Sequence, residues 1–251
     1  MSSKANTVTV VTGGGRGIGR AIVRRLLREK VRIVTCGRGQ RPPDLDDAVV
    51  WIEADVSRPP DAERLIRAAS DHGSLAILVN NAGVQIEKTV TDTTDDEWDS
   101  VVGTNCRGVF NMCRQALPEM SKDGGCIINI GSIAGEVSEP SMAIYNASKA
   151  FVHALTRSIA VDHGPAVRCN AVCPGWIETE LTKSAFAVAK SPDRARGDAL
   201  ARHPAGRLGT PQAVANLVAW LTSEESRFMT GQCLTLDGGL TAASPVRPGL
   251  F

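Results

Sequence analysis

Two side chains that can exchange protons stand four residues apart in the segment Tyr145-Asn146-Ala147-Ser148-Lys149. Residues four apart on an α-helix project from one face, so the phenol and the ammonium group can share a pocket. A phenol has an ordinary pKa of about 10, and lowering it by about three units needs roughly 4 kcal/mol. A nearby ammonium group in a partly desolvated site supplies such stabilisation, so we expect Lys149 to lower the pKa of Tyr145. The pair predicts general acid–base chemistry.

Other polar residues fall where a ligand crevice would form. Ser132 comes just after the strand-like run 126–130, and Asn80-Asn81-Ala82-Gly83 ends the apolar run 75–79. Strand carboxyl ends face the ligand crevice in open α/β sheets, so we expect Ser132 to hydrogen-bond a substrate oxygen. Asn105 interrupts an apolar helical stretch, and a buried asparagine needs partners. These placements favour a catalytic interpretation of the Tyr145–Lys149 pair.

A glycine-rich segment, Thr12-Gly13-Gly14-Gly15-Arg16-Gly17-Ile18-Gly19, follows the first strand-like run and opens a helical pattern. Gly13 permits a tight turn, Gly17 lets backbone N–H groups approach a pyrophosphate, and Gly19 allows close packing of helix on strand. The helix N-terminus adds donors and partial positive charge. A glycine turn that binds nothing is the alternative, and the position between strand and helix argues against it.

Strand and helix patterns alternate along the whole chain. Short apolar runs predict strands at 8–11, 31–36, 49–53, 75–79, 126–130, 166–173 and 232–236. Helical periodicity falls at 17–29, 61–72, 95–121, 141–163 and 210–221, with Pro59-Pro60 as a stop and Thr210-Pro211 as an N-terminal cap. This order predicts a Rossmann-type, doubly wound α/β fold: a mostly parallel sheet of about seven strands with helices on both faces.

No linker, repeat or break in composition divides the chain, so we expect one domain over residues 1–251. The one irregular stretch, residues 177–207, is polar and rich in alanine. Because loops at strand carboxyl ends carry specificity, we expect this stretch to form a lid over the substrate.

The glycine segment, Asn80–Gly83, Asn105, Ser132 and Tyr145–Lys149 resemble, in order and spacing, the motifs of the short-chain dehydrogenase/reductase family. The resemblance covers residues 8–239. It implies an oxidoreductase that moves a hydride between a nicotinamide ring and a carbonyl or secondary alcohol. Tyr145 would be the general acid/base, Ser132 would orient the substrate oxygen, Lys149 would also bind the nicotinamide ribose, and Asn105 would hold a water of a proton relay.

The resemblance also implies the coenzyme contacts. Asp55 would hold the adenine amino group, Val56 would pack on its ring, and Trp176 would be either a substrate wall or lid packing. The expected coenzyme-binding residues are Gly13, Arg16, Gly17, Ile18, Gly19, Gly37, Arg38, Asp55, Val56, Asn81, Ala82, Gly83, Tyr145, Lys149, Pro174, Gly175, Ile177 and Thr179.

The end of the second strand indicates which coenzyme binds. Folds selective for NAD carry an acidic residue there, whereas this chain has Gly37-Arg38. Arg38 and Arg16 can offer guanidinium donors to a 2′-phosphate. We therefore expect NADP(H), with NAD(H) as the alternative.

Bulk composition narrows the function classes. The 28 Lys and Arg against 27 Asp and Glu give a net charge of +1, which argues against nucleic acid or membrane as a partner. Arg20, Arg24, Arg25 and Arg28 fall at helical spacing and suggest a solvated helix face. Cys169 and Cys173 lack a second ligand pair, so no metal site is predicted. With neither a signal peptide nor an apolar run long enough to span a bilayer, we expect a soluble, cytoplasmic protein.

The sequence does not determine the substrate, and three alternatives remain for the function. A 3-oxoacyl-(carrier protein) reductase is one alternative, although Cys126 stands where we expect that enzyme's basic docking residue. A reductase or dehydrogenase of a small ketone, sugar or polyol is another, and a non-catalytic dinucleotide-binding regulator is a third. Long apolar helices at 95–121 and 141–163 suggest a homotetramer, the family's common assembly.

Overall fold

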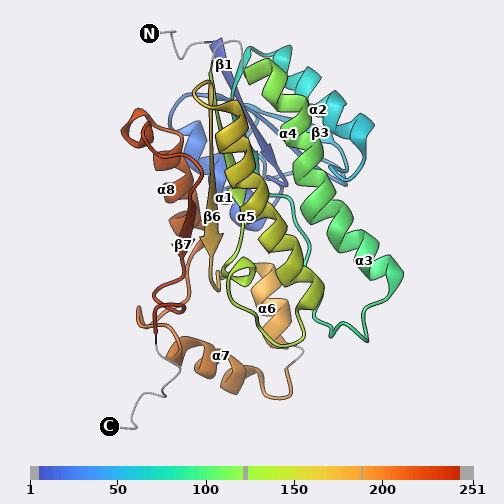
Figure 1. Cartoon of the computed structure of the whole chain (residues 1–251), viewed down its shortest axis with the longest axis vertical. Coiled ribbons are helices and arrows are strands. Elements are labelled where there is room, and N and C mark those ends of the chain that lie inside the picture. The colour runs from blue at the N-terminus through green and yellow to red at the C-terminus, as the bar shows by residue number, and fades with distance from the viewer. Residues whose placement is uncertain (1–5, 121–123, 188, 244–251) are drawn as a thin grey trace.

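The computed structural model describes residues 6–120, 124–187 and 189–243, and its centre is one parallel sheet (Figure 1). The strand order is β3-β2-β1-β4-β5-β6-β7, with every neighbouring pair parallel. The strands are β1 (Thr7–Thr12), β2 (Arg32–Gly37), β3 (Val49–Glu53), β4 (Ser74–Asn80), β5 (Gly125–Ile130), β6 (Val167–Pro174) and β7 (Cys233–Leu236). All seven predicted strands are confirmed, and so is the doubly wound α/β fold.

Helices cover both faces of the sheet. One layer holds α1 (Gly17–Leu27) and α8 (Pro211–Leu221), which pack together through buried residues such as Ile22 and Val218. The other layer holds α2 (Pro59–Ser70), α4 (Val109–Met120) and α5 (Ala143–His163). A sheet buried on both faces explains why its strands are nearly continuous apolar runs.

The start of α2 corrects one sequence-based expectation. Pro59 and Pro60 do not stop an element; they occupy the first two positions of the helix, which begins two residues before the predicted Asp61. Proline fits there because its fixed φ suits a helix and the missing N–H would be unpaired anyway. Thr210 and Pro211 behave as predicted: the Thr210 hydroxyl accepts from the Ala213 N–H, and Pro211 opens α8.

The single helix predicted over 95–121 is three segments. It begins as α3 (Asp95–Val101), where Thr94 and Glu97 form a capping box. The turns then widen into a π-helix over Val102–Gly108 before α4 resumes the ordinary pitch. Because π-helices are rare and occur most often at functional sites, the position of Asn105 inside this segment is informative.

The expected irregular stretch 177–207 contains two helices, α6 (Glu180–Ala187) and α7 (Pro192–Ala201). Both lie beyond the carboxyl end of β6 (Figure 1). A parallel bridge between Ile177 and Gly209 closes the segment at its base. The expectation of irregular structure was therefore wrong for these two helices.

Strand order reverses between β1 and β4, whose connections run to opposite sides of the sheet. A crevice forms outside the strand ends at such a switch point. In the part of the chain that the structure describes, no helix is both long and apolar enough to cross a bilayer.

Candidate active site

Ser132, Tyr145 and Lys149 lie together at the carboxyl edge of the sheet. Tyr145 and Lys149 come from the first two turns of α5, and Ser132 follows β5 as the cap of a short 3-10 turn, η3 (Ile133–Gly135). The Ser132 side chain hydrogen-bonds the Tyr145 hydroxyl, and Lys149 Nζ lies 5.6 Å from the centre of the Tyr145 ring. All three line one pocket. The geometry can orient an oxygen atom and transfer a proton to or from it.

Asn105 lies behind this group and lines neither part of the groove described below. Its amide Nδ2 donates to the Val84 carbonyl at 2.8 Å and to Ser148 Oγ at 3.0 Å, while Oδ1 accepts from the Val84 N–H at 2.9 Å. These bonds tie the segment after β4 to α5. Both Nδ2 hydrogens and one lone pair of Oδ1 are engaged in this way, so a water held by Asn105 would contact the second lone pair of Oδ1 or the backbone.

Burial governs the pKa values of the Tyr145–Lys149 pair. It raises the pKa of Tyr145 to about 12, with the Glu139 carboxylate adding to the shift and the Ser132 hydrogen bond opposing it. Burial also lowers the pKa of Lys149 to about 8. Lys149 Nζ donates to the Ile130 carbonyl at 2.8 Å. The expected lowering of the Tyr145 pKa by Lys149 is therefore not found. The pKa of Tyr145 is raised instead, because desolvation disfavours the charged form of both groups.

The glycine segment forms the turn between β1 and α1. Gly13 has a φ of +69°, which glycine adopts without strain. At Gly19 a Cβ atom would stand 2.3 Å from the Gly13 carbonyl oxygen, so only glycine permits this approach of helix and loop. Arg16 precedes the helix and its side chain makes no capping bond to the first turn. The first-turn N–H groups of α1 can therefore hold a phosphate.

A continuous groove joins this loop to the Tyr145 pocket, because Ile18, Asn81, Gly83, Val84 and Thr179 line both parts. All the residues predicted to contact coenzyme line the groove. The adenosine and pyrophosphate part has Gly13, Arg16, Gly17, Ile18, Gly19, Gly37, Arg38, Asp55, Val56, Asn81, Ala82, Gly83 and Thr179. The part near Ser132 has Tyr145, Lys149, Pro174, Gly175, Trp176 and Ile177. The cradle fits an extended dinucleotide.

Comparison with known families agrees with this geometry. The family model described as enoyl-(acyl carrier protein) reductase, one of the short-chain dehydrogenase/reductase models, matches residues 13–241. The chain belongs to the short-chain dehydrogenase/reductase family. It is therefore an oxidoreductase of carbonyl and secondary-alcohol groups.

Two curated relatives span nearly the whole dehydrogenase/reductase chain. 2-(S)-hydroxypropyl-CoM dehydrogenase 3 of Xanthobacter autotrophicus is 37% identical over 249 residues, covering 94% of this chain and 97% of the relative. The 3-oxoacyl-(acyl-carrier-protein) reductase of Thermotoga maritima is 33% identical over 247 residues, covering 93% and 97%.

Two solved structures share the fold. The ligand-free aldohexose dehydrogenase of Thermoplasma acidophilum superimposes with a TM-score of 0.92 at 33% identity, covering 98% of each chain. A structure described as ElxO with NADP bound gives a TM-score of 0.86 at 28% identity, covering 95% of this chain and all of the other.

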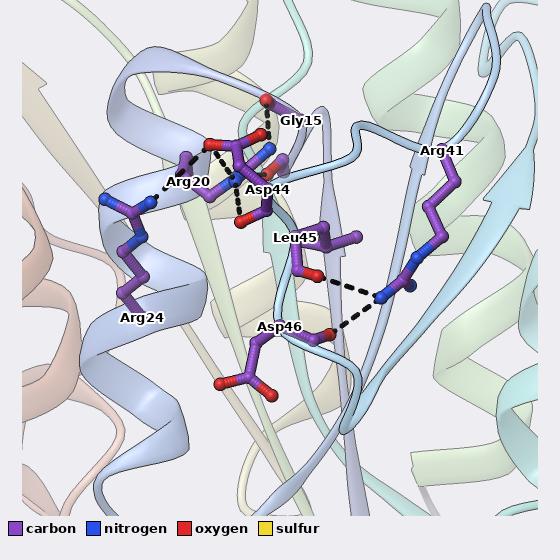
Figure 2. A network of polar contacts seen from close by, with 8 residues as sticks. Gly15, Arg20, Arg24, Arg41, Asp44, Leu45 and Asp46 are labelled. Carbon is purple, nitrogen blue, oxygen red and sulfur yellow. Dashed lines mark hydrogen bonds and ion pairs between the residues drawn. The ribbon is translucent and has the colours of Figure 1, made fainter.

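Arg20 is a residue of this dehydrogenase/reductase whose role the sequence did not reveal. It was expected on a solvated face with Arg24, yet its side chain is only 8% exposed. Its guanidinium donates to the Gly15 carbonyl at 2.7 Å and to the Asp44 carboxylate at 2.9 Å (Figure 2). It also donates to the Gly14 carbonyl at 3.1 Å. Arg20 therefore fixes the phosphate-loop backbone. Helical spacing cannot distinguish it from Arg24, because only the fold brings Asp44 close.

The adenosine end of the groove is bounded by exposed arginines and one indole. Arg16 and Arg38 are both exposed at its rim. Trp51 packs against Gly37, where a Cβ atom would stand 2.6 Å from the ring, and its Nε1 donates to the Gly39 carbonyl at 3.2 Å. One oxygen of Asp55 is engaged by the Ser57 backbone and hydroxyl. Trp51 is a further lining residue that the sequence motifs did not identify.

Trp176 and Glu139 form a wall of the substrate end. The Trp176 ring stacks on Phe186 of α6, with centroids 5.3 Å apart and planes at 12°. Its Nε1 donates to Glu139 Oε1 at 3.0 Å. Trp176 was expected here from the sequence, whereas Glu139 was not, because no motif marks the loop before α5. Glu139 places a carboxylate near the Tyr145 hydroxyl.

Proposed function

We propose that this short-chain dehydrogenase/reductase uses NADP(H) to reduce the carbonyl group of a small, uncharged, hydroxylated substrate. The observation that supports this most strongly is the continuity of the Ser132–Tyr145–Lys149 pocket with a groove that has Arg16 and Arg38 at its far end. Bound nicotinamide coenzyme would supply the hydride. The protein then has to bind, orient and exchange a proton.

The side chains divide that work in the proposed mechanism. Ser132 donates a hydrogen bond to the substrate oxygen and stabilises the charge that develops there. Tyr145 donates its proton to the same oxygen, and its raised pKa keeps the phenol protonated at neutral pH. Lys149 lies beside the ring and can return a proton to Tyr145, with Asn105 holding a water of the relay. In the reverse direction Tyr145 must lose its proton first.

The preference for NADP(H) rests on charge. Gly37 and Arg38 stand where an NAD-selective fold carries a carboxylate, so no acidic side chain holds the ribose diol or repels a 2′-phosphate from that position. The exposed guanidinium groups of Arg38 and Arg16 suit a phosphate. The NADP named for the related ElxO structure supports this choice.

The charges around Tyr145 favour an uncharged substrate. Among the described residues of this pocket, Lys149 is the only cation, and it is engaged with the Ile130 carbonyl. Glu139 would repel an acidic substituent and can accept hydrogen bonds from substrate hydroxyls. This supports a sugar or hydroxyketone as the carbonyl substrate, or a polyol in the reverse direction, and the enzyme of similar fold is named for an aldohexose.

A 3-oxoacyl-(carrier protein) reductase is the second candidate, favoured by the full-length similarity to the Thermotoga maritima enzyme. Cys126, which stands where that enzyme is expected to carry a basic docking residue, is buried in β5 and its Sγ donates to the Leu221 carbonyl, so it offers a carrier no charged contact.

We also propose the homotetramer and the lid. Trp98, Phe110, Phe151 and Val161 expose apolar side chains along α3, α4 and α5, as an interface between copies of the chain would require. The segment 177–207, which carries α6 and α7, would close over the substrate. Light scattering tests the assembly, and a monomer in solution would contradict it.

The test of the proposed function follows oxidation of reduced coenzyme by absorbance. NADPH and NADH are each paired with aldoses, neutral hydroxyketones, β-keto acids and a 3-oxoacyl thioester. Faster turnover with NADPH and neutral hydroxylated carbonyls supports the proposal. A marked preference for NADH contradicts the proposed coenzyme. Faster turnover of the acidic or thioester substrates contradicts the proposed substrate class.

A further inference from the structure

Three side chains with metal-binding atoms meet behind the Ser132 loop. His153 lies on α5 one turn beyond Lys149, Cys173 lies near the end of β6, and Cys233 begins β7. His153 Nε2 is 3.1 Å from Cys173 Sγ, and the ligand atoms of all three residues lie within 4.8 Å of one another. This group is not part of the proposed acid–base chemistry.

The packing holds these side chains toward a common point. His153 and Cys173 are buried. Cys233 pairs with Ala171 across the β6–β7 ladder, so its side chain lies on the same face of the sheet as that of Cys173. A Cβ atom at Gly131 would stand 2.7 Å from His153 Nε2, so the loop backbone lies directly against the imidazole. The three residues are therefore arranged before any ion binds.

We propose that His153, Cys173 and Cys233 bind one thiophilic divalent cation, with Zn²⁺ as the ion that fits best. Zinc–sulfur bonds of about 2.3 Å and zinc–nitrogen bonds of about 2.0–2.1 Å place tetrahedral ligand atoms roughly 3.5–3.8 Å apart. The His153–Cys173 pair must open slightly from 3.1 Å, and the largest separation of 4.8 Å must close by about 1 Å, which side-chain rotation can supply. Two Zn–S bonds and one Zn–N bond form, and the two thiol protons leave to solvent.

The surroundings suit this ion. Glu136 Oε1 lies 4.0 Å from His153 Nδ1, where a carboxylate can orient a metal-bound imidazole. The Arg157 guanidinium lies 3.8 Å from Cys233 Sγ and favours the thiolate form that a metal needs. Two thiolates neutralise the charge of the ion, so the nearby cations do not exclude it. Within the described chain no other His, Cys, Asp or Glu joins the group, which leaves the fourth position for water.

The sequence-based expectation of no metal considered only Cys169 and Cys173, which are close in sequence. Cys169 belongs to another part of the core, where its Sγ accepts from Asn129 Nδ2. The partners of Cys173 come from α5 and β7, and only the folded sheet brings them together. Half-buried Cys233 gives an ion a route from solvent.

Cobalt substitution provides the test. The metal-free, reduced full-length protein is titrated anaerobically with Co²⁺, and we expect one equivalent to give a thiolate-to-cobalt charge-transfer band and tetrahedral d–d bands, both removed by Zn²⁺. The variants Cys233→Ser and Cys173→Ser each keep one thiolate, so each should lose about half of the charge-transfer intensity and bind Co²⁺ more weakly. Glu136→Gln, which keeps all three ligands, should weaken binding by about tenfold.

Cys106→Ser is the matched control, because Cys106 is the only other free cysteine that is not fully buried in the described chain. It should keep the spectrum. Circular dichroism checks that each variant folds, and Cys233→Ser, at the less buried position, is the decisive one. Absence of a thiolate band in the wild-type protein, a band of undiminished intensity in Cys233→Ser, or a Cys173–Cys233 disulfide in the reduced preparation would overturn the proposal.

Discussion

Lys149 Nζ lies 5.6 Å from the centre of the Tyr145 ring, and its hydrogen bond goes to the Ile130 carbonyl rather than to the phenol. Burial raises the pKa of Tyr145 to about 12 and lowers that of Lys149 to about 8. Near neutrality the pair therefore consists of a neutral phenol and an ammonium group. That is the form in which Tyr145 acts as an acid.

This arrangement predicts opposite pH dependence for the two directions. Reduction needs the protonated phenol of Tyr145, whose pKa is raised to about 12. We therefore expect kcat/KM for the carbonyl to stay level from neutrality to about pH 8, where Lys149 begins to lose its proton. Alcohol oxidation needs the phenolate, so kcat/KM for the alcohol should rise steadily as the pH increases above neutrality. Initial rates in both directions across this range provide the measurement. An oxidation rate that falls with rising pH would contradict the assignment.

Glu139 contributes to the raised pKa of Tyr145. Glu139→Gln removes the charge, while the amide oxygen can still accept from Trp176 Nε1. We expect the alkaline rise of alcohol oxidation to move to lower pH and KM for acidic carbonyl substrates to fall. Glu63→Gln, on the distant helix α2, is the control and should leave the profile in place. An unchanged pH profile in Glu139→Gln would show that Glu139 does not affect the pKa of Tyr145.

Arg38 should set the coenzyme preference. A charge-assisted hydrogen bond contributes about 1.5–3 kcal/mol, so Arg38→Ala should raise KM for NADPH by roughly 10- to 100-fold and change KM for NADH little. Arg28→Ala is the matched control, because Arg28 is equally exposed but lies outside the groove. Steady-state kinetics with both coenzymes measure the effect. An equal rise of KM for NADPH and NADH would mean that Arg38 does not bind the 2′-phosphate.

Arg20 should stabilise the phosphate loop. Arg20→Met leaves the Gly14 and Gly15 carbonyls and Asp44 without their donor. We expect a loss of about 2 kcal/mol, which lowers Tm by roughly 4–8 °C, together with a higher KM for coenzyme. Arg24→Met is the control, because Arg24 pairs with the same Asp44 carboxylate but its side chain is 61% exposed. Its loss should lower the free energy of unfolding by less than about 0.5 kcal/mol. Equal effects of the two substitutions in thermal unfolding would contradict this role.

Local patterns were sufficient to predict most of the fold. Every strand is an apolar run and the catalytic residues sit at strand ends or one helical turn apart, so Ser132, Tyr145 and the glycine loop could be placed from spacing. The π-helix around Asn105 could not be predicted in this way, because Asn105 inside it bonds to Val84 and Ser148, which lie 21 and 43 residues away in sequence. The contacts of Arg20 and Glu139 likewise arise between segments distant in sequence.

The central claim is that Tyr145 gives its proton to the substrate oxygen. Tyr145 is the only tyrosine in the chain, so no other phenol can replace it. The most direct measurement is kcat for carbonyl reduction by Tyr145→Phe, with NADPH binding measured on the same protein. We predict a fall of about 10²–10⁴-fold with NADPH affinity kept. Turnover near that of the wild-type enzyme would contradict the account.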